Sequence, residues 1–197
     1  MTALRKKPDN LDALVGLKRT GQIVLARHLA DFDEAVLKGE RELAISAFEN
    51  ADDFNNLVAS INVTLAFPEA KRALFNSVKN AHVEEIYIEG SEHLEFLRYI
   101  EALELFERIE ELVPGFKDAA ALADYSFCKP EYELGNSAME DGKYRTAYKA
   151  YNNVVDRDAS FEDAGDRRQE ALDTGRYTIA LMKFENGSNR RNVHVKV

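Results

Sequence analysis

A repeat with a period of 45 residues constrains the fold of this chain more than any other feature of its sequence. Residues 87–106 align without gaps on residues 132–151, and the agreement continues to residues 119 and 164. The matched pairs are Tyr87/Tyr132, Gly90/Gly135, Tyr99/Tyr144, Ala102/Ala147, Phe106/Tyr151, Ile109/Val154, Phe116/Phe161 and Asp118-Ala119/Asp163-Ala164. A weaker upstream copy aligns Gly39, Ala44, Ala47, Phe48 and Ala51 with Gly142, Ala147, Ala150, Tyr151 and Val154.

Each copy has the pattern of a helix, a tight turn and a second helix. Gly39 and Gly142 stand at the turn, where glycine tolerates the left-handed backbone that ends many helices. The middle copy has Leu97 there, so we expect its turn to be made in another way or its two helices to merge in part. After the turn, apolar residues recur at spacings of three and four, which places them on one helical stripe. They are Ala102, Leu105, Phe106 and Ile109 in the middle copy, and Ala147, Ala150, Tyr151 and Val154 in the last.

These residues resemble the tetratricopeptide repeat (TPR), a helical hairpin with a 34-residue period. The last copy supplies Gly135, Gly142, Tyr144, Ala147, Tyr151, Val154 and Ala159 at the spacing of that family, and the middle copy supplies Gly90, Tyr99, Ala102, Phe106, Ile109 and Pro114. Ala3 and Pro8 have the separation found at the end of such a unit. The resemblance implies an all-α fold over residues 1–175, a right-handed superhelix of stacked hairpins.

The period differs from that of the family by about 11 residues, or roughly three helical turns. A first helix lengthened by whole turns keeps its apolar stripe facing the same way, so we expect lengthened helices. The segment before Gly135 is either one long helix or two shorter ones, and Pro130 favours a break or kink at Lys129-Pro130.

The pattern changes after Gly175, which is placed as a helix C-cap. Residues 176–197 contain the segment RYTIALMKFENGSN, which predicts a strand followed by a turn. This segment resembles the opening strand of domains of the curli-secretion and penicillin-binding-protein-activator lipoprotein type. We therefore expect the chain to be cut from a longer protein, a bacterial lipoprotein of the cell envelope or periplasm.

Composition and motifs exclude several classes of function. A net charge of −9 disfavours nucleic acid, and no apolar run approaches the roughly 20 residues that span a bilayer. Cys128 is the sole cysteine, which leaves no internal disulfide, and we expect it to be a buried or half-buried thiol rather than a nucleophile. The histidines have no metal-ligand spacing, and residues 52–56, although rich in oxygen ligands, are interpreted as a connection between helices. We expect no enzyme activity, no metal and no cofactor.

The resemblance implies a protein-protein interaction scaffold that binds its partner on the concave face, lined by the first helix of each copy. The implied residues are Glu84, Tyr87, Ser91, Leu94 and Glu95 in the middle copy, and Lys129, Tyr132, Asn136, Met139 and Glu140 in the last. The two tyrosines are either interface anchors or side chains packed between the helices. The three glutamates favour a protein or peptide partner that is basic or neutral. The alternative function is a structural, self-assembling segment of an envelope protein.

Overall fold

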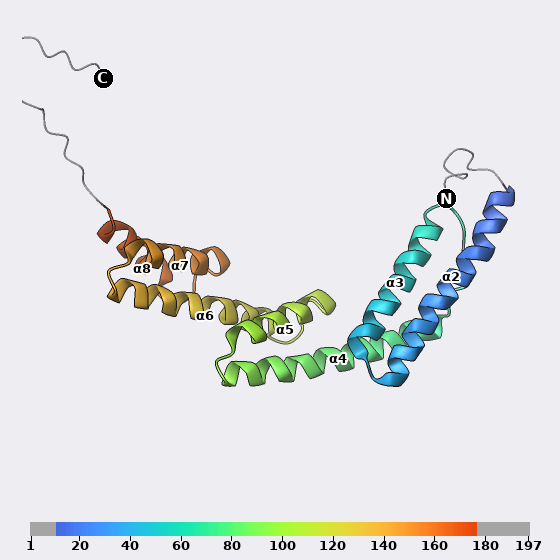
Figure 1. Ribbon diagram of the computed structural model, residues 1–197, viewed down its shortest axis with the longest axis horizontal. Coiled ribbons are helices and arrows are strands. Elements are labelled where there is room, and N and C mark those ends of the chain that lie inside the picture. The colour runs from blue at the N-terminus through green and yellow to red at the C-terminus, as the bar shows by residue number, and fades with distance from the viewer. Residues whose placement is uncertain (1–10, 177–197) are drawn as a thin grey trace, which may run out of the picture. The chain divides into compact units, whose positions relative to one another are not determined.

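The computed structural model describes residues 11–176, and every element of regular structure in that range is an α-helix (Figure 1). The helices are α2 (Leu11–Lys38), α3 (Arg41–Ala59), α4 (Glu69–Glu95), α5 (Tyr99–Leu112), α6 (Ala119–Glu140), α7 (Tyr144–Arg157) and α8 (Ala164–Thr174). The all-α prediction is therefore confirmed for this range. Residues 1–8 and 177–197, which carry the predicted half-repeat and C-terminal strand, lie outside the described residues.

The chain divides into two compact units at Pro130. The first unit, as far as the structure describes it, contains α2 to α5 and the start of α6, and the second contains the rest of α6 with α7 and α8. Helix α6 runs through Pro130 without interruption, so of the break or kink expected at Lys129-Pro130 the break is not found. Pro130 has no N–H to donate to the carbonyl of Ser126, and the helix continues with that one hydrogen bond missing.

The helix boundaries repeat with the period of the sequence. Helices α5 and α7 each have 14 residues and begin 45 positions apart, at Tyr99 and Tyr144. The preceding first helices end 45 positions apart, at Glu95 and Glu140. These first helices have 27 and 22 residues, so the extra length of the repeat lies in the first helix of each hairpin.

One turn geometry joins the two helices of all three hairpins. Gly39, Leu97 and Gly142 have left-handed backbones, with φ of 75°, 57° and 69°. In each turn this residue donates its N–H three residues back, and the next residue donates five residues back, which is the Schellman motif. Both alternatives predicted for the middle turn are wrong, because Leu97 adopts the backbone of the glycines and the helices stay separate.

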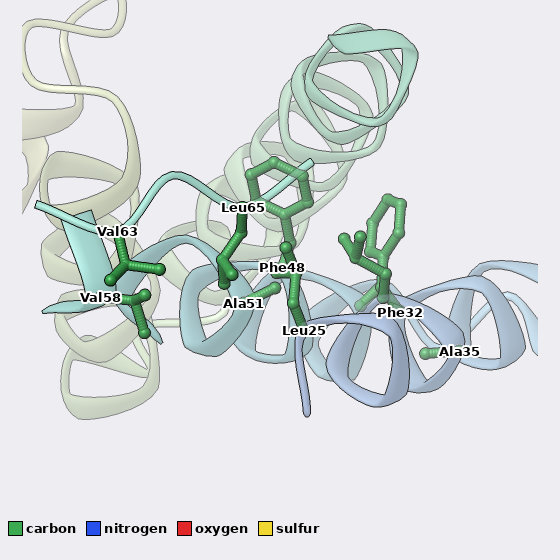
Figure 2. Close-up of a cluster of buried hydrophobic side chains, with 10 residues drawn as sticks. Leu25, Phe32, Ala35, Phe48, Ala51, Val58, Val63 and Leu65 are labelled. Carbon is green, nitrogen blue, oxygen red and sulfur yellow. The ribbon is translucent and has the colours of Figure 1, made fainter. Parts of the chain in front are cut away.

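The first core lies between α2, α3 and the segment that follows α3 (Figure 2). Phe32 of α2 meets the ring of Phe48 of α3 edge-on, and Phe48 stacks on Phe75 of α4 with ring centroids 4.1 Å apart. Val63 and Leu65 cover the open side of the hairpin after α3 has ended. Residues 52–56 lie inside α3, so the predicted connection there is wrong. Asp52 instead pairs with Arg72 of α4 at 2.5 Å.

A second core joins this hairpin to α4 and α5. Ile45 of α3 is fully buried in the same cluster as Val83 of α4 and Phe106 of α5. A polar network follows the same junction, because Glu42 contacts His82 of α4 at 2.8 Å and Arg108 of α5 at 2.7 Å. The N-terminal hairpin is therefore attached to its neighbour by both apolar packing and charge.

The second unit packs α7 against the C-terminal part of α6 and against α8. Ala147, Ala150, Tyr151 and Val154 form the buried stripe of α7, as the sequence predicts. Ala138 of α6 and Ala171 of α8 complete the cluster with small side chains that allow close approach. Gly175 caps α8 as predicted, but its φ of −80° is right-handed. A Cβ at Gly175 would lie 3.0 Å from Cβ of Tyr144, so close packing accounts for the glycine.

Candidate functional site

The residues predicted on α4 are held mostly by contacts within the protein. Glu84 pairs with Lys117 at 2.6 Å, and the Tyr87 hydroxyl donates a hydrogen bond to Asp118 Oδ1 at 2.6 Å. Ser91 Oγ donates to the carbonyl oxygen of Tyr87, and the half-buried Leu94 packs on the second core. The N-terminal part of this predicted face is therefore tied to the loop between α5 and α6.

The ring of Tyr87 is packed as well as hydrogen-bonded. It meets Phe106 of α5 and Phe116 of the following loop edge-on, with centroids 5.9 and 5.8 Å away. The Lys117 ammonium lies 4.2 Å from the Tyr87 ring centroid, a cation–π distance. Of the two alternatives stated for the tyrosines, packing between helices describes the surroundings of Tyr87.

The same constellation occurs 45 residues later in the second unit. Tyr132 donates its hydroxyl proton to Asp163, and its ring lies edge-on to Tyr151 and Phe161. The Tyr151 hydroxyl donates to Asn136 Oδ1 at 2.7 Å, so Asn136, a predicted site residue, is engaged in the core.

The remaining predicted residues of α6 lie before Tyr132 or after Asn136 in the sequence. Met139 is half-buried against the core cluster of the second unit, whereas Lys129, also half-buried, belongs to the first unit. The predicted set on α6 is thus divided between the two units.

The bonds to aspartate also shift the pKa of both tyrosines, and one of them shifts the pKa of Asp163. The hydrogen bond to Asp118 and, secondarily, burial raise the pKa of Tyr87, and the bond to Asp163 does the same for the pKa of Tyr132. The bond from Tyr132 in turn lowers the pKa of Asp163. Both effects favour the neutral phenol beside the ionised carboxylate, the state in which the pair is stable at neutral pH.

The C-terminal end of each first helix is the part of the predicted face that stays open. Glu95 and Glu140 occupy equivalent positions in the last turn of α4 and α6, and both are exposed. Among residues 11–176, neither carboxylate has a hydrogen-bond or ion-pair partner. Each stands at a helix C-terminus, where the helix dipole already favours cations. Both predicted glutamates are therefore exposed in the structure, and their role in partner binding stays a prediction.

Three exposed apolar side chains next to Glu95 were missed by the sequence analysis. Phe96, Leu97 and Ile100 surround the turn between α4 and α5, and their exposed fractions are 69%, 69% and 71%. We call these three residues the α4–α5 tip. Of the three, the sequence distinguishes only Leu97, as an unusual turn residue. The sequence signal for Phe96 and Ile100 is that their equivalents in the last copy, Asp141 and Arg145, are charged.

The described residues also bear on the requirements of a metal site and of a membrane-spanning helix. No three acidic, histidine or cysteine side chains between residues 11 and 176 are grouped as metal ligands, and Cys128 is buried, as predicted. No helix within that range has the length and hydrophobicity required to cross a bilayer. Comparisons of the sequence with protein-family models and with curated proteins give no match.

Proposed function

We propose that this chain is a TPR-like scaffold that binds a basic or neutral protein or peptide. The observation that carries the proposal is the open pair Glu95 and Glu140, which presents the same unpartnered carboxylate at the same place in two copies of one hairpin. The packed tyrosines support the role of a rigid scaffold, because they hold each first helix to the start of the next one. Rigid arrays of helical hairpins are suited to extended protein contacts.

The superhelical arrangement of the hairpins is part of this proposal. Its support is the sequence repeat, the common turn geometry and the shared tyrosine contacts within each unit. The place of the chain in a bacterial envelope lipoprotein rests on residues 176–197 and remains a prediction from sequence.

A photo-crosslinking amino acid at position 95 tests the proposed function. With the protein expressed from its own gene in its source cells, we expect adducts with another protein at position 95 and none at Ser46, an exposed control position on α3. Absence of adducts at position 95 would contradict the proposal.

Self-assembly is the second candidate, and one observation favours it. Helix α2 exposes Leu11, Val15, Ile23 and Leu37 on one side, at intervals close to whole helical turns. An uncovered apolar stripe of this kind can pack against a second copy. Light scattering at increasing protein concentration separates the two functions, because self-assembly predicts a mass that rises with concentration, whereas a scaffold for another protein predicts a constant mass for the isolated chain.

A further inference from the structure

The α4–α5 tip places large apolar side chains in water at a position where the fold does not require them. Phe96 is the C-cap of α4, Leu97 forms the turn and Ile100 is the second residue of α5. The equivalent residues of the last copy are Asp141, Gly142 and Arg145, and that copy makes the same two turn hydrogen bonds. Polar residues thus suffice to build this turn.

The backbone of the tip also departs from what the turn favours. Leu97 has a φ of 57°, a region that side chains other than glycine, asparagine and aspartate seldom adopt. The other two hairpins place glycine at this position. A strained leucine with an exposed side chain gives nothing to the core, so its place in the sequence needs an explanation outside the folding of the hairpin.

Four exposed acidic residues flank the tip, and Arg98, whose guanidinium carbon lies 5.7 Å from the Phe96 ring centroid, is the one basic residue beside them. Glu92 lies one helical turn before Phe96 and Glu104 one turn after Ile100, while Glu95 and Glu101 adjoin the tip in sequence, and all four are exposed. Residues 89–104 contain five glutamates and one arginine, which gives a net charge of −4. The equivalent residues 134–149 contain two acidic and three basic residues, a net charge of +1.

We propose that the α4–α5 tip is the docking point for a basic amphipathic segment of a partner protein, with apolar side chains that cover Phe96, Leu97 and Ile100. This inference rests on the proposed scaffold function and names the chemistry of its partner. The apolar tip supplies contact area, and the glutamates select a segment rich in lysine or arginine. The same charges repel anionic lipid surfaces and a second copy of this acidic chain.

Two designed peptides serve as probes. One is a short amphipathic helix of leucine and lysine with blocked ends, and the other has glutamate in place of every lysine. Fluorescence anisotropy of labelled peptide, titrated with the whole chain, measures the affinity. We expect the lysine peptide to bind, to bind more weakly as salt is raised, and the glutamate peptide not to bind.

A variant based on the last copy of the repeat tests whether the lysine peptide binds at the α4–α5 tip. Phe96→Asp with Ile100→Arg installs residues that the equivalent turn already accommodates, and it leaves the net charge unchanged. We expect it to weaken binding of the lysine peptide by about tenfold or more. The control is Leu43→Ser, which removes an exposed leucine from α3 and should leave the affinity unchanged. Circular dichroism checks that both variants stay folded.

The outcomes separate this inference from the proposed function. Equal binding of the two peptides, or full binding by the Phe96→Asp/Ile100→Arg variant, overturns the docking point, whereas adducts at position 95 would still support a scaffold. Binding of neither peptide also overturns it, as does co-sedimentation with anionic vesicles that the double variant abolishes. Absence of adducts between position 95 and another protein, by contrast, counts against the scaffold function itself.

Discussion

Gly135 lies so close to the ring of Tyr151 that a Cβ atom at position 135 would come within 2.5 Å of Cε1 of Tyr151. The ring has little freedom to retreat, because its hydroxyl is bonded to Asn136 Oδ1. In the middle copy a Cβ at Gly90 would lie 3.1 Å from the Phe106 ring, which has no hydroxyl to anchor it. The repeat thus contains the same close contact in a tight and a looser form.

This contact predicts an order of stability for three glycine-to-alanine variants. Gly16→Ala, in an exposed part of α2 with no neighbour within 4 Å, should stabilise by up to about 1 kcal/mol through helix propensity alone. Gly90→Ala should be nearly neutral, since a slight clash offsets that gain. Gly135→Ala should destabilise by about 1–2 kcal/mol through overpacking. Urea denaturation measures all three, and a Gly135→Ala variant as stable as Gly16→Ala would contradict the contact.

Removal of the phenolic hydroxyl from Tyr87 or Tyr132 should destabilise its unit. Each hydroxyl donates to a carboxylate at the surface, so we expect a loss of about 1 kcal/mol for Tyr87→Phe and for Tyr132→Phe. Tyr148→Phe is the control, and it should change the free energy of unfolding by less than about 0.3 kcal/mol. A control that costs as much as the two test variants would show that the bonds to aspartate are not the cause.

The tyrosine pairs also predict a dependence of stability on pH. The pKa of Tyr132 is raised in the folded state, so its contribution is complete below its ordinary value of about 10 and is lost as pH rises through the raised pKa. The pKa of Asp163 is lowered, so its contribution is complete above its ordinary value of about 4 and is lost as pH falls through the lowered pKa. The stability difference between the wild type and Tyr132→Phe should therefore be largest near neutral pH and shrink at both extremes.

Leu97→Gly should stabilise the first unit. Glycine adopts the left-handed backbone freely, whereas leucine loses about 1 kcal/mol there, and the exposed side chain has little packing to give up. The reverse change, Gly142→Leu, should destabilise the second unit by a similar amount. Thermal unfolding of both variants measures the pair. A loss of stability in Leu97→Gly would mean that the Leu97 side chain packs in the free protein.

Ile45→Ala should weaken the attachment of the N-terminal hairpin to α4 and α5. Ile45 is fully buried and is the residue of α3 that enters the second core, so its truncation should cost about 2–4 kcal/mol. Leu43→Ala, two residues away and exposed, should cost less than about 0.5 kcal/mol. Hydrogen exchange of α3 and α4 would show whether the loss is confined to this junction.

Much of this architecture could be predicted because the repeat encodes it locally. The glycines at two turns, the apolar stripes of α5 and α7 and the lengthened first helices all follow from residue spacing within one hairpin. The continuation of α6 through Pro130 could not be predicted in this way. A proline removes one hydrogen bond, and whether the helix continues depends on the residues around it.

The tertiary contacts of the site could not be predicted in the same way. Tyr87 and Tyr132 reach aspartates 31 residues further along the chain, and no spacing rule within a helix reveals such a bond. Glu95 and Glu140 are predicted because the resemblance implies equivalent site positions in each copy, and the structure adds that both are exposed. Within their own hairpin Phe96 and Ile100 look like core residues, and in sequence only comparison with their polar equivalents in the last copy, Asp141 and Arg145, sets them apart.

The most direct test of this account is a nuclear magnetic resonance titration of the chain with the lysine peptide, in which each backbone amide is compared with the amide 45 positions later. We predict shift changes concentrated in residues 92–104 and little change in residues 137–149, because both hairpins share a fold but only the middle copy carries the acidic, apolar tip. Equal changes in both ranges, or changes only in the second, would contradict it.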